Sequence, residues 1–121
     1  MPSAEPELRR HLGRVEGRAW DIEDVLHELE EGRALAWGMR RGPEVLGFWI
    51  TRVENTWTHK YGLVWIVAGT GLEVGLPAYR EVIEPWFWSQ GCEWIEINGR
   101  KGWKRVLPEY EESAVVLRRY R

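Results

Sequence analysis

The sequence predicts an α+β domain with a mixed sheet, in which an antiparallel meander continues into one parallel βαβ pair and helices flank the strands. Three observations support this class. Strand-like segments at residues 34–39 and 45–53 are joined by a short turn, and a third segment begins at Tyr61. An unbroken apolar run, residues 63–68, is followed by glycines and a helical pattern. An alternating segment, residues 93–97, comes next, and strand–helix–strand units place their strands in parallel.

Length and composition describe an ordinary globular domain. The 121 residues suit one domain, with residues 1–20 as an N-terminal helical extension. Hydrophobic residues make up 44% and charged residues 30%, and the net charge of −2 gives no reason to expect nucleic acid. No apolar run approaches the roughly 20 residues that cross a bilayer, so we expect a cytoplasmic protein without a membrane partner.

Two helices are expected before the first strand. Pro6 can open the first, with Leu8, Leu12 and Val15 on its apolar side, and Gly17 breaks it.

The second helix begins at Asp21, which is placed as an N-cap, and ends at Gly32. Its apolar stripe contains four residues: Ile22, Val25, Leu26 and Leu29.

The meander shows alternation in its second strand. Side chains of this strand are expected to divide between the two faces of the sheet, with Leu46, Phe48 and Ile50 on one and Trp49, Thr51 and Val53 on the other. The third strand, with its run of apolar residues, is expected to be buried on both faces.

The βαβ unit has a glycine-containing connection. Gly69, Gly71 and Gly75 are assigned to a loop, and Pro77 suits the first turn of the helix because its missing N–H has no partner there. The helix has a stripe at helical spacing and ends in a left-handed cap; these residues are Tyr79, Val82, Ile83 and Trp86, with Gly91 as the cap. In the strand that follows, Ile95 and Ile97 share one face and Trp94 and Glu96 the other.

This connection is the natural place for a phosphate-bearing ligand, because the start of a helix presents N–H groups without partners. After the βαβ unit we expect a short helix over residues 101–107, a break at Pro108 and a closing strand over residues 113–119.

Cysteine and histidine give no sign of catalysis or metal binding. Cys92 is the single cysteine, which excludes an internal disulfide and fits a reducing compartment, and we expect it to be an inert core thiol. His11 and His59 have no partners at metal-ligand spacing, so no metal site is expected.

Nine tryptophans stand out in the composition. Most are expected to build the core. Trp86 and Trp88 lie two residues apart on one helix and cannot share a face, so at least one is expected at a surface that contacts a partner.

The order of elements resembles the GNAT acyltransferase fold from about Asp21 onward, although a clear first strand is lacking. More narrowly, two patterns resemble small GNAT-like proteins encoded by tailed phages, some of which are similar to a virion-associated protein of short-tailed phages. These patterns are EDVLHELEEGRALAW and GC-x-W-I-E-I-x-G-R-K-G-W-x-R-x-L-P-x-Y.

The chain departs from the family at both of its chemical landmarks. GNAT enzymes bind the pyrophosphate of acetyl-CoA on an R-x-x-G-x-G/A loop. Aligning Gly75 with its last glycine puts Glu73 at the middle glycine and Thr70 at the arginine, so a carboxylate would face two phosphates. The family's tyrosine in the last helix is also missing: Trp103 lies in that region, and Tyr110 is a displaced substitute at best.

Two functions follow from the resemblance. The first is a non-catalytic domain without a cofactor, which acts in the host cytoplasm or the virion as a virion-associated or assembly protein. It would contact phage structural proteins or a second copy of itself through Trp86, Trp88 and Trp103.

The second function is an acetyl-CoA-dependent N-acyltransferase with a degenerate loop. The cofactor would lie on four residues of the connection and helix start: Gly71, Gly75, Leu76 and Ala78. Glu54 or Glu96 would be the general base and Tyr110 the acid. The plainer alternative is that the glycines only turn the chain and that these three are ordinary surface residues.

A nucleic-acid-binding module is the weakest of the functions considered. The basic residues Arg100, Lys101, Lys104 and Arg105 are accompanied by one suitable aromatic residue, Trp103. Glutamates lie among the basic residues of this end of the chain, which favours a solvated surface of mixed sign.

Overall fold

Residues 5–15, 20–70, 72–97 and 107–110 are described by a computed structural model of the chain, with the backbone alone for residues 72–74. Its elements follow the predicted order: α1 (Glu5–Gly13), α2 (Ile22–Glu30), β1 (Leu35–Arg41), β2 (Glu44–Asn55), β3 (Lys60–Gly69), α3 (Leu72–Ala78), the π-helical segment η1 (Tyr79–Ile83), α4 (Glu84–Ser89) and β4 (Ile95–Ile97). The expected helix break at Gly17 and the closing strand over residues 113–119 lie outside the described residues, as does nearly all of the helix expected over residues 101–107.

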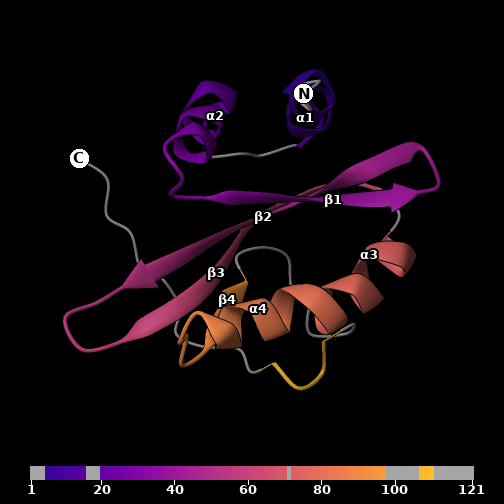
Figure 1. Cartoon of the computed structure of the whole chain (residues 1–121). Coiled ribbons are helices and arrows are strands. Elements are labelled where there is room, and N and C mark those ends of the chain that lie inside the picture. Colours follow the sequence, from indigo (N-terminus) through magenta and orange to yellow (C-terminus); the bar gives the residue numbers. More distant parts are fainter. Residues whose placement is uncertain (1–4, 16–19, 71, 98–106, 111–121) are drawn as a thin grey trace, which may run out of the picture.

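The sheet has the predicted mixed topology. Its strand order is β1-β2-β3-β4, with the first two pairings antiparallel and the β3–β4 pairing parallel. Helices α1 and α2 cover one face, and the continuous helix formed by α3, η1 and α4 covers the other (Figure 1). The α+β class and the mixed sheet are therefore confirmed, and the core has two layers.

The layer under α1 and α2 is aliphatic. Leu12 and Val25 are fully buried there and pack with residues from β2 and β3, namely Phe48, Ile50, Ile66 and Ala68. The ring of His11 lies edge-on to Phe48, with 5.9 Å between centroids.

The layer under the long helix is aromatic. Trp49 stacks on Tyr79 with 4.6 Å between ring centroids, and Phe87 is fully buried against Gly62 of β3. Cys92 is buried in this layer as expected, and burial raises the pKa of its thiol.

Two register shifts change which face a side chain occupies. Met39 of β1 pairs with Gly47 and Arg40 pairs with Val45, so Leu46 is an extra residue in β2. Leu46 consequently packs in the aromatic layer, and the prediction that it shares a face with Phe48 is wrong.

The second register shift lies in β3. Ile50 pairs with Ile66 and Thr51 with Val64, which makes Trp65 the extra residue. Val64 therefore faces the aromatic layer while Ile66 faces the aliphatic one, which confirms that β3 is covered on both faces.

The long helix begins earlier than predicted. It starts at Leu72, so Gly75 lies within α3 instead of in the loop, and Pro77 is not in the first turn. A Cβ on Gly75 would lie 2.2 Å from Met39 Sδ and 3.0 Å from Trp49 Nε1. The glycine is therefore needed for close packing of the helix against the sheet. From sequence alone, the same glycine indicates a loop.

The helix ends also differ in part from expectation. Asp21 has the extended backbone of an N-cap, but its side chain makes no capping hydrogen bond. Gly32 and Gly91, with φ of 76° and 85°, follow α2 and α4 as predicted. The π-helical segment rotates the helix face, which leaves Val82 52% exposed and makes its assignment to the apolar stripe wrong.

Candidate functional site

Strands β3 and β4 are parallel neighbours in the described part of the chain. Three pairs join them: Gly62 with Ile95, Leu63 with Glu96, and Val64 with Ile97. Beyond these pairs β3 bulges at Trp65 and continues to Gly69, whereas the described part of β4 reaches Ile97. Residues 65–69 of β3 therefore extend past the described part of β4.

The start of the long helix lies at the same end of β3. Thr70 N–H donates to the carbonyl of Leu46 at 2.9 Å, and the chain enters α3 at Leu72. Gly69 has φ of 109°, and a Cβ there would lie 2.3 Å from the Leu46 oxygen. This tight turn brings the start of α3 close to the end of β3.

The residues proposed to hold a cofactor lie in different parts of the structure. Gly71 lies outside the described residues, and only the backbone of Glu73 is described, in the first turn of α3. Gly75 and Ala78 instead line a cavity of about 310 Å³ between β1 and the long helix. Leu76 packs against the aromatic layer. Their role in binding acetyl-CoA stays a prediction.

Glu54 and Glu96 are brought together on one face of the sheet. Glu54 pairs with Tyr61 across β2 and β3, and Glu96 follows Ile95, which packs in the opposite layer. The pKa of Tyr61 is raised by burial and then by the charges of Glu96 and Glu54. Each carboxylate has a partner: Arg52 Nε lies 2.7 Å from Glu54, and Trp94 Nε1 donates to Glu96 at 3.0 Å.

Tyr110 lies in the other layer. Its hydroxyl donates to Glu84 Oε2 at 2.6 Å and lies 2.6 Å from the hydroxyl of Tyr79. Burial and these hydrogen bonds raise the pKa of Tyr110 far above its usual value. Because the sheet separates Tyr110 from Glu54 and Glu96, the structure does not bring the three predicted catalytic residues into one site.

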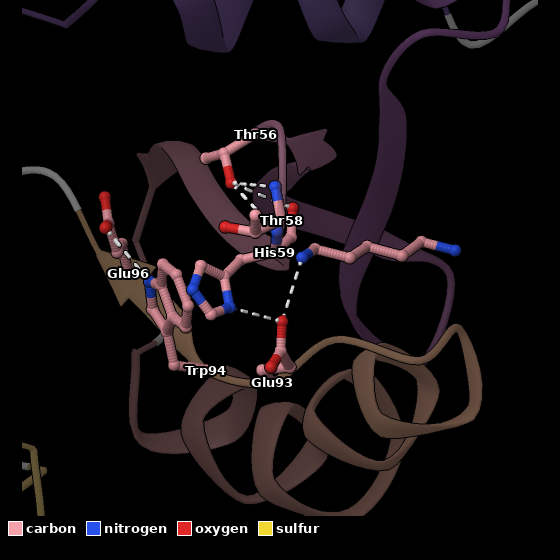
Figure 2. A network of polar contacts seen from close by, with 7 residues as sticks. Thr56, Thr58, His59, Glu93, Trp94 and Glu96 are labelled. Carbon is pink, nitrogen blue, oxygen red and sulfur yellow. Dashed lines mark hydrogen bonds and ion pairs between the residues drawn. The ribbon is translucent and has the colours of Figure 1, made fainter.

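A polar network, shown in Figure 2, fixes the β2–β3 turn to the start of β4. Thr56 Oγ1 accepts the His59 N–H at 2.9 Å. Glu93 Oε2 lies 2.9 Å from His59 Nδ1 and accepts the Lys60 N–H at 3.2 Å. This network was not predicted from the sequence, although a threonine side chain can bond to the backbone in such a turn.

Replacing Glu93 with glutamine is expected to flatten the acid side of the stability profile. Its hydrogen bonds with His59 and the Lys60 N–H lower the Glu93 pKa below the ordinary 4.5. A lowered carboxyl pKa adds stability above the ordinary value, and this stability is lost as the pH falls through the folded value. Melting temperatures measured between about pH 6 and pH 3 should therefore fall more steeply for the wild type than for Glu93→Gln.

Glu30→Gln is the matched control, because no described residue forms a hydrogen bond or ion pair with the exposed Glu30. Parallel profiles for the wild type and Glu93→Gln would contradict the assignment.

The tryptophans predicted to contact a partner have different environments. Trp86 is half-buried, edge-on to Trp37 at 5.4 Å, while Trp88 is 50% exposed, so the prediction that they cannot both be buried is confirmed. Trp103 lies outside the described residues. The sequence missed Trp57, which projects from the β2–β3 turn and is fully exposed.

Among the described residues, neither a metal-binding cluster nor a membrane-spanning helix is found. No group of three histidine, cysteine, aspartate or glutamate side chains is arranged to hold a metal ion. No described helix has the length and apolar character that crossing a membrane requires.

Comparison with known proteins identifies the fold. No family profile and no curated protein sequence matches this chain. Among solved structures, an aminoglycoside antibiotic 6'-N-acetyltransferase from Acinetobacter haemolyticus has a TM-score of 0.68 at 12% identity, covering 98% of this chain and 92% of its own. Glucosamine-6-phosphate N-acetyltransferase from Arabidopsis thaliana has a TM-score of 0.66 at 13% identity, covering 99% and 94%. A transcriptional regulator from Bacillus halodurans has a TM-score of 0.73 at 14% identity, covering 99% and 95%.

The chain therefore has the fold of GNAT acetyltransferases over nearly its whole length. Similarity at these identities establishes the fold and leaves activity to be argued from the site.

Proposed function

We propose that this protein is an N-acyltransferase that uses acetyl-CoA as its acyl donor. The observation that carries the proposal is the end of β3, which continues past the last described pair with β4, Val64 with Ile97, and leads through a tight turn into α3. A strand end next to a helix N-terminus suits a ligand that has phosphates, because the first N–H groups of a helix have no intrahelical partner.

The residues present fit the two parts of acetyl-CoA unequally. The main chain of β3 from Trp65 to Gly69, which lies beyond the described pairing with β4, would hold the amide-containing arm. The first N–H groups of α3 would hold the pyrophosphate, but Glu73 lies in that turn and its charge opposes phosphate. When bound, the thioester of acetyl-CoA supplies the acyl group. We therefore expect binding that is weaker than in enzymes with an arginine and glycines at this place.

Glu96 is the better placed of the two candidate bases. It pairs with Leu63 and lies next to the last described pair of β3 and β4, whereas Glu54 lies across β3 in β2. As a base, Glu96 would accept a proton from the attacking amine. Tyr110 would need a change of partners to act as an acid, since its hydroxyl already donates to Glu84.

A non-catalytic contact domain is the second candidate function, and one observation favours it. Trp57 is fully exposed at the tip of a hydrogen-bonded turn, and Trp88 is half exposed on α4. Tryptophan is enriched among residues that dominate protein–protein interfaces. A role as a virion-associated or assembly protein of a phage belongs to this candidate.

Titration with acetyl-CoA separates the two candidates. Calorimetry should show saturable binding in the micromolar range, and tryptophan fluorescence should respond because Trp86 and Trp88 lie on the helix that follows β3. The absence of binding at millimolar acetyl-CoA would overturn the enzyme and leave the contact domain.

Replacing Glu73 by glycine or glutamine is expected to tighten acetyl-CoA binding by about tenfold, because about 1.4 kcal/mol of repulsion is removed. The dissociation constant measured by calorimetry checks this. Glu81→Gln is the matched control: it removes a similar exposed charge from a later turn of the same helix and should leave the affinity unchanged. Equal affinities for the wild type and both Glu73 variants would show that this carboxylate does not face the phosphates.

A further inference from the structure

The strand β1 forms one edge of the described sheet. It pairs with β2 on one side, and no described strand lies on its other side. Natural proteins protect such edges with charges, prolines or bulges. Here the bulge and the arginines are confined to one end, while residues 35–39 have no charge or proline, and Leu35 is 43% exposed. This half of the edge is therefore open to pairing with another extended chain.

An apolar cavity of about 310 Å³ runs beside this edge, between β1 and the long helix. Trp49 and Ile83 at its base are buried, and Val82 at its rim is 52% exposed. Its remaining lining comes from two elements, with Trp37, Gly38, Met39 and Arg40 in β1 and Gly75 and Ala78 in α3. A strand placed on the edge would present every second side chain toward this cavity.

The charge of Arg40, beside the cavity, indicates which kind of extended segment would bind to β1. Arg40 is exposed, lines the cavity and has no hydrogen bond or ion pair with any described residue. A carboxylate on an added strand would form a charge-assisted hydrogen bond with its guanidinium.

We propose that β1 binds an extended segment of a partner protein as an additional strand of the sheet. The segment contributes main-chain hydrogen bonds to the edge, an apolar side chain to the cavity and an acidic residue beside Arg40. In the described sheet, β1 and β4 lie at opposite ends of the strand order.

A second copy of this chain does not suit the site. The side chains that its β1 would offer to the cavity are already engaged: Trp37 Nε1 donates to Thr51 Oγ1 at 2.9 Å, and Met39 is buried within its own core. The strand also carries Arg40 and Arg41 and no acidic residue. Pairing with a second copy would therefore leave the cavity unfilled and would bring no acidic residue to Arg40.

A capped peptide of alternating valine and glutamate tests the proposal with the full chain. Fluorescence anisotropy should show saturable binding, and hydrogen exchange should show new protection of the β1 amides. Peptides in which lysine replaces glutamate, or in which alternate main-chain nitrogens are methylated, should bind at least about tenfold more weakly, because they lose the charge match or the ladder hydrogen bonds.

Two protein variants complete the test. Arg40→Glu should weaken binding of the glutamate peptide and strengthen binding of the lysine peptide. Ala78→Leu, which fills the cavity from an exposed helix position, should weaken binding of both peptides. Arg14→Glu, an exposed charge reversal on the chain after α1, is the control and should change neither affinity. Thermal melts confirm that each variant is folded.

Several outcomes overturn the proposal. These are no binding of the glutamate peptide at millimolar concentration, affinity that survives main-chain methylation, and affinity that is unchanged in both Arg40→Glu and Ala78→Leu. Protection of the outer β1 amides in the free protein, or a dimer that dissociates when β1 is mutated, would show that another segment or a second copy occupies the edge.

Discussion

Replacing Trp49 with alanine is expected to lower the free energy of unfolding by about 3–5 kcal/mol, whereas the same change at Trp57 should alter it by less than about 0.5 kcal/mol. Trp49 is 1% exposed, and its ring stacks on Tyr79 with an interplanar angle of 10°. Trp57 is fully exposed and leaves no cavity when it is truncated. Chemically identical substitutions thus measure burial alone.

Chemical denaturation followed by circular dichroism measures both variants without relying on the tryptophan signal. Since small domains are stable by about 5–15 kcal/mol, Trp49→Ala is expected to be close to the limit of folding. The milder change Trp49→Phe should retain part of the stacking on Tyr79, and its loss of unfolding free energy should lie between those of Trp49→Ala and Trp57→Ala. Similar losses for Trp49→Ala and Trp57→Ala would contradict the assignment of Trp49 to the core and of Trp57 to the surface.

Gly62→Ala is expected to destabilise the protein by about 1–3 kcal/mol through overpacking. A Cβ at this position would lie 2.4 Å, 2.6 Å and 2.8 Å from three ring atoms of Phe87, which is itself fully buried. The backbone cannot easily move away, because Gly62 is held between Val53 of β2 and Ile95 of β4.

A double-mutant cycle with Phe87→Leu tests this cause. Each single change should destabilise, one by overpacking and the other by leaving a cavity, and the pair should be less destabilised than the sum of the two by about 1 kcal/mol or more. Gly38→Ala is the matched control on β1, since its Cβ would meet the Phe48 ring at an ordinary 3.8 Å. Additive losses in the cycle would show that the ring of Phe87 is not what Gly62 accommodates.

Periodicity predicted the elements well where alternation was uninterrupted. Ile95 and Ile97 face the aromatic layer as expected, and glycines end α2 and α4. The failures occur where one residue is inserted into a regular pattern. Leu46 changes face because it is a bulged residue, and Val82 is exposed because the helix widens into a π-turn. Both depend on contacts with distant elements, which no local pattern encodes.

The candidate site was less accessible to sequence reasoning. Glu54 and Glu96 could be selected one at a time as carboxylates near strand ends, but their common neighbour Tyr61 follows from strand pairing. Likewise, nothing in the sequence linked Tyr110 to Tyr79 and Glu84, which hold its hydroxyl. Gly75 was misread because a glycine that permits close packing has the same local signature as one that turns the chain.

The parallel pairing of β4 with β3 also has a consequence for the order of folding. The meander from β1 to β3 consists of hairpins that close locally, whereas β4 reaches β3 only after the whole helix has crossed the sheet. Contacts that are distant in sequence form late. Hydrogen exchange at Ile95–Ile97 should therefore be faster than in the middle of β2 and β3. A ligand that contacts both β3 and β4 would therefore stabilise the final step of folding.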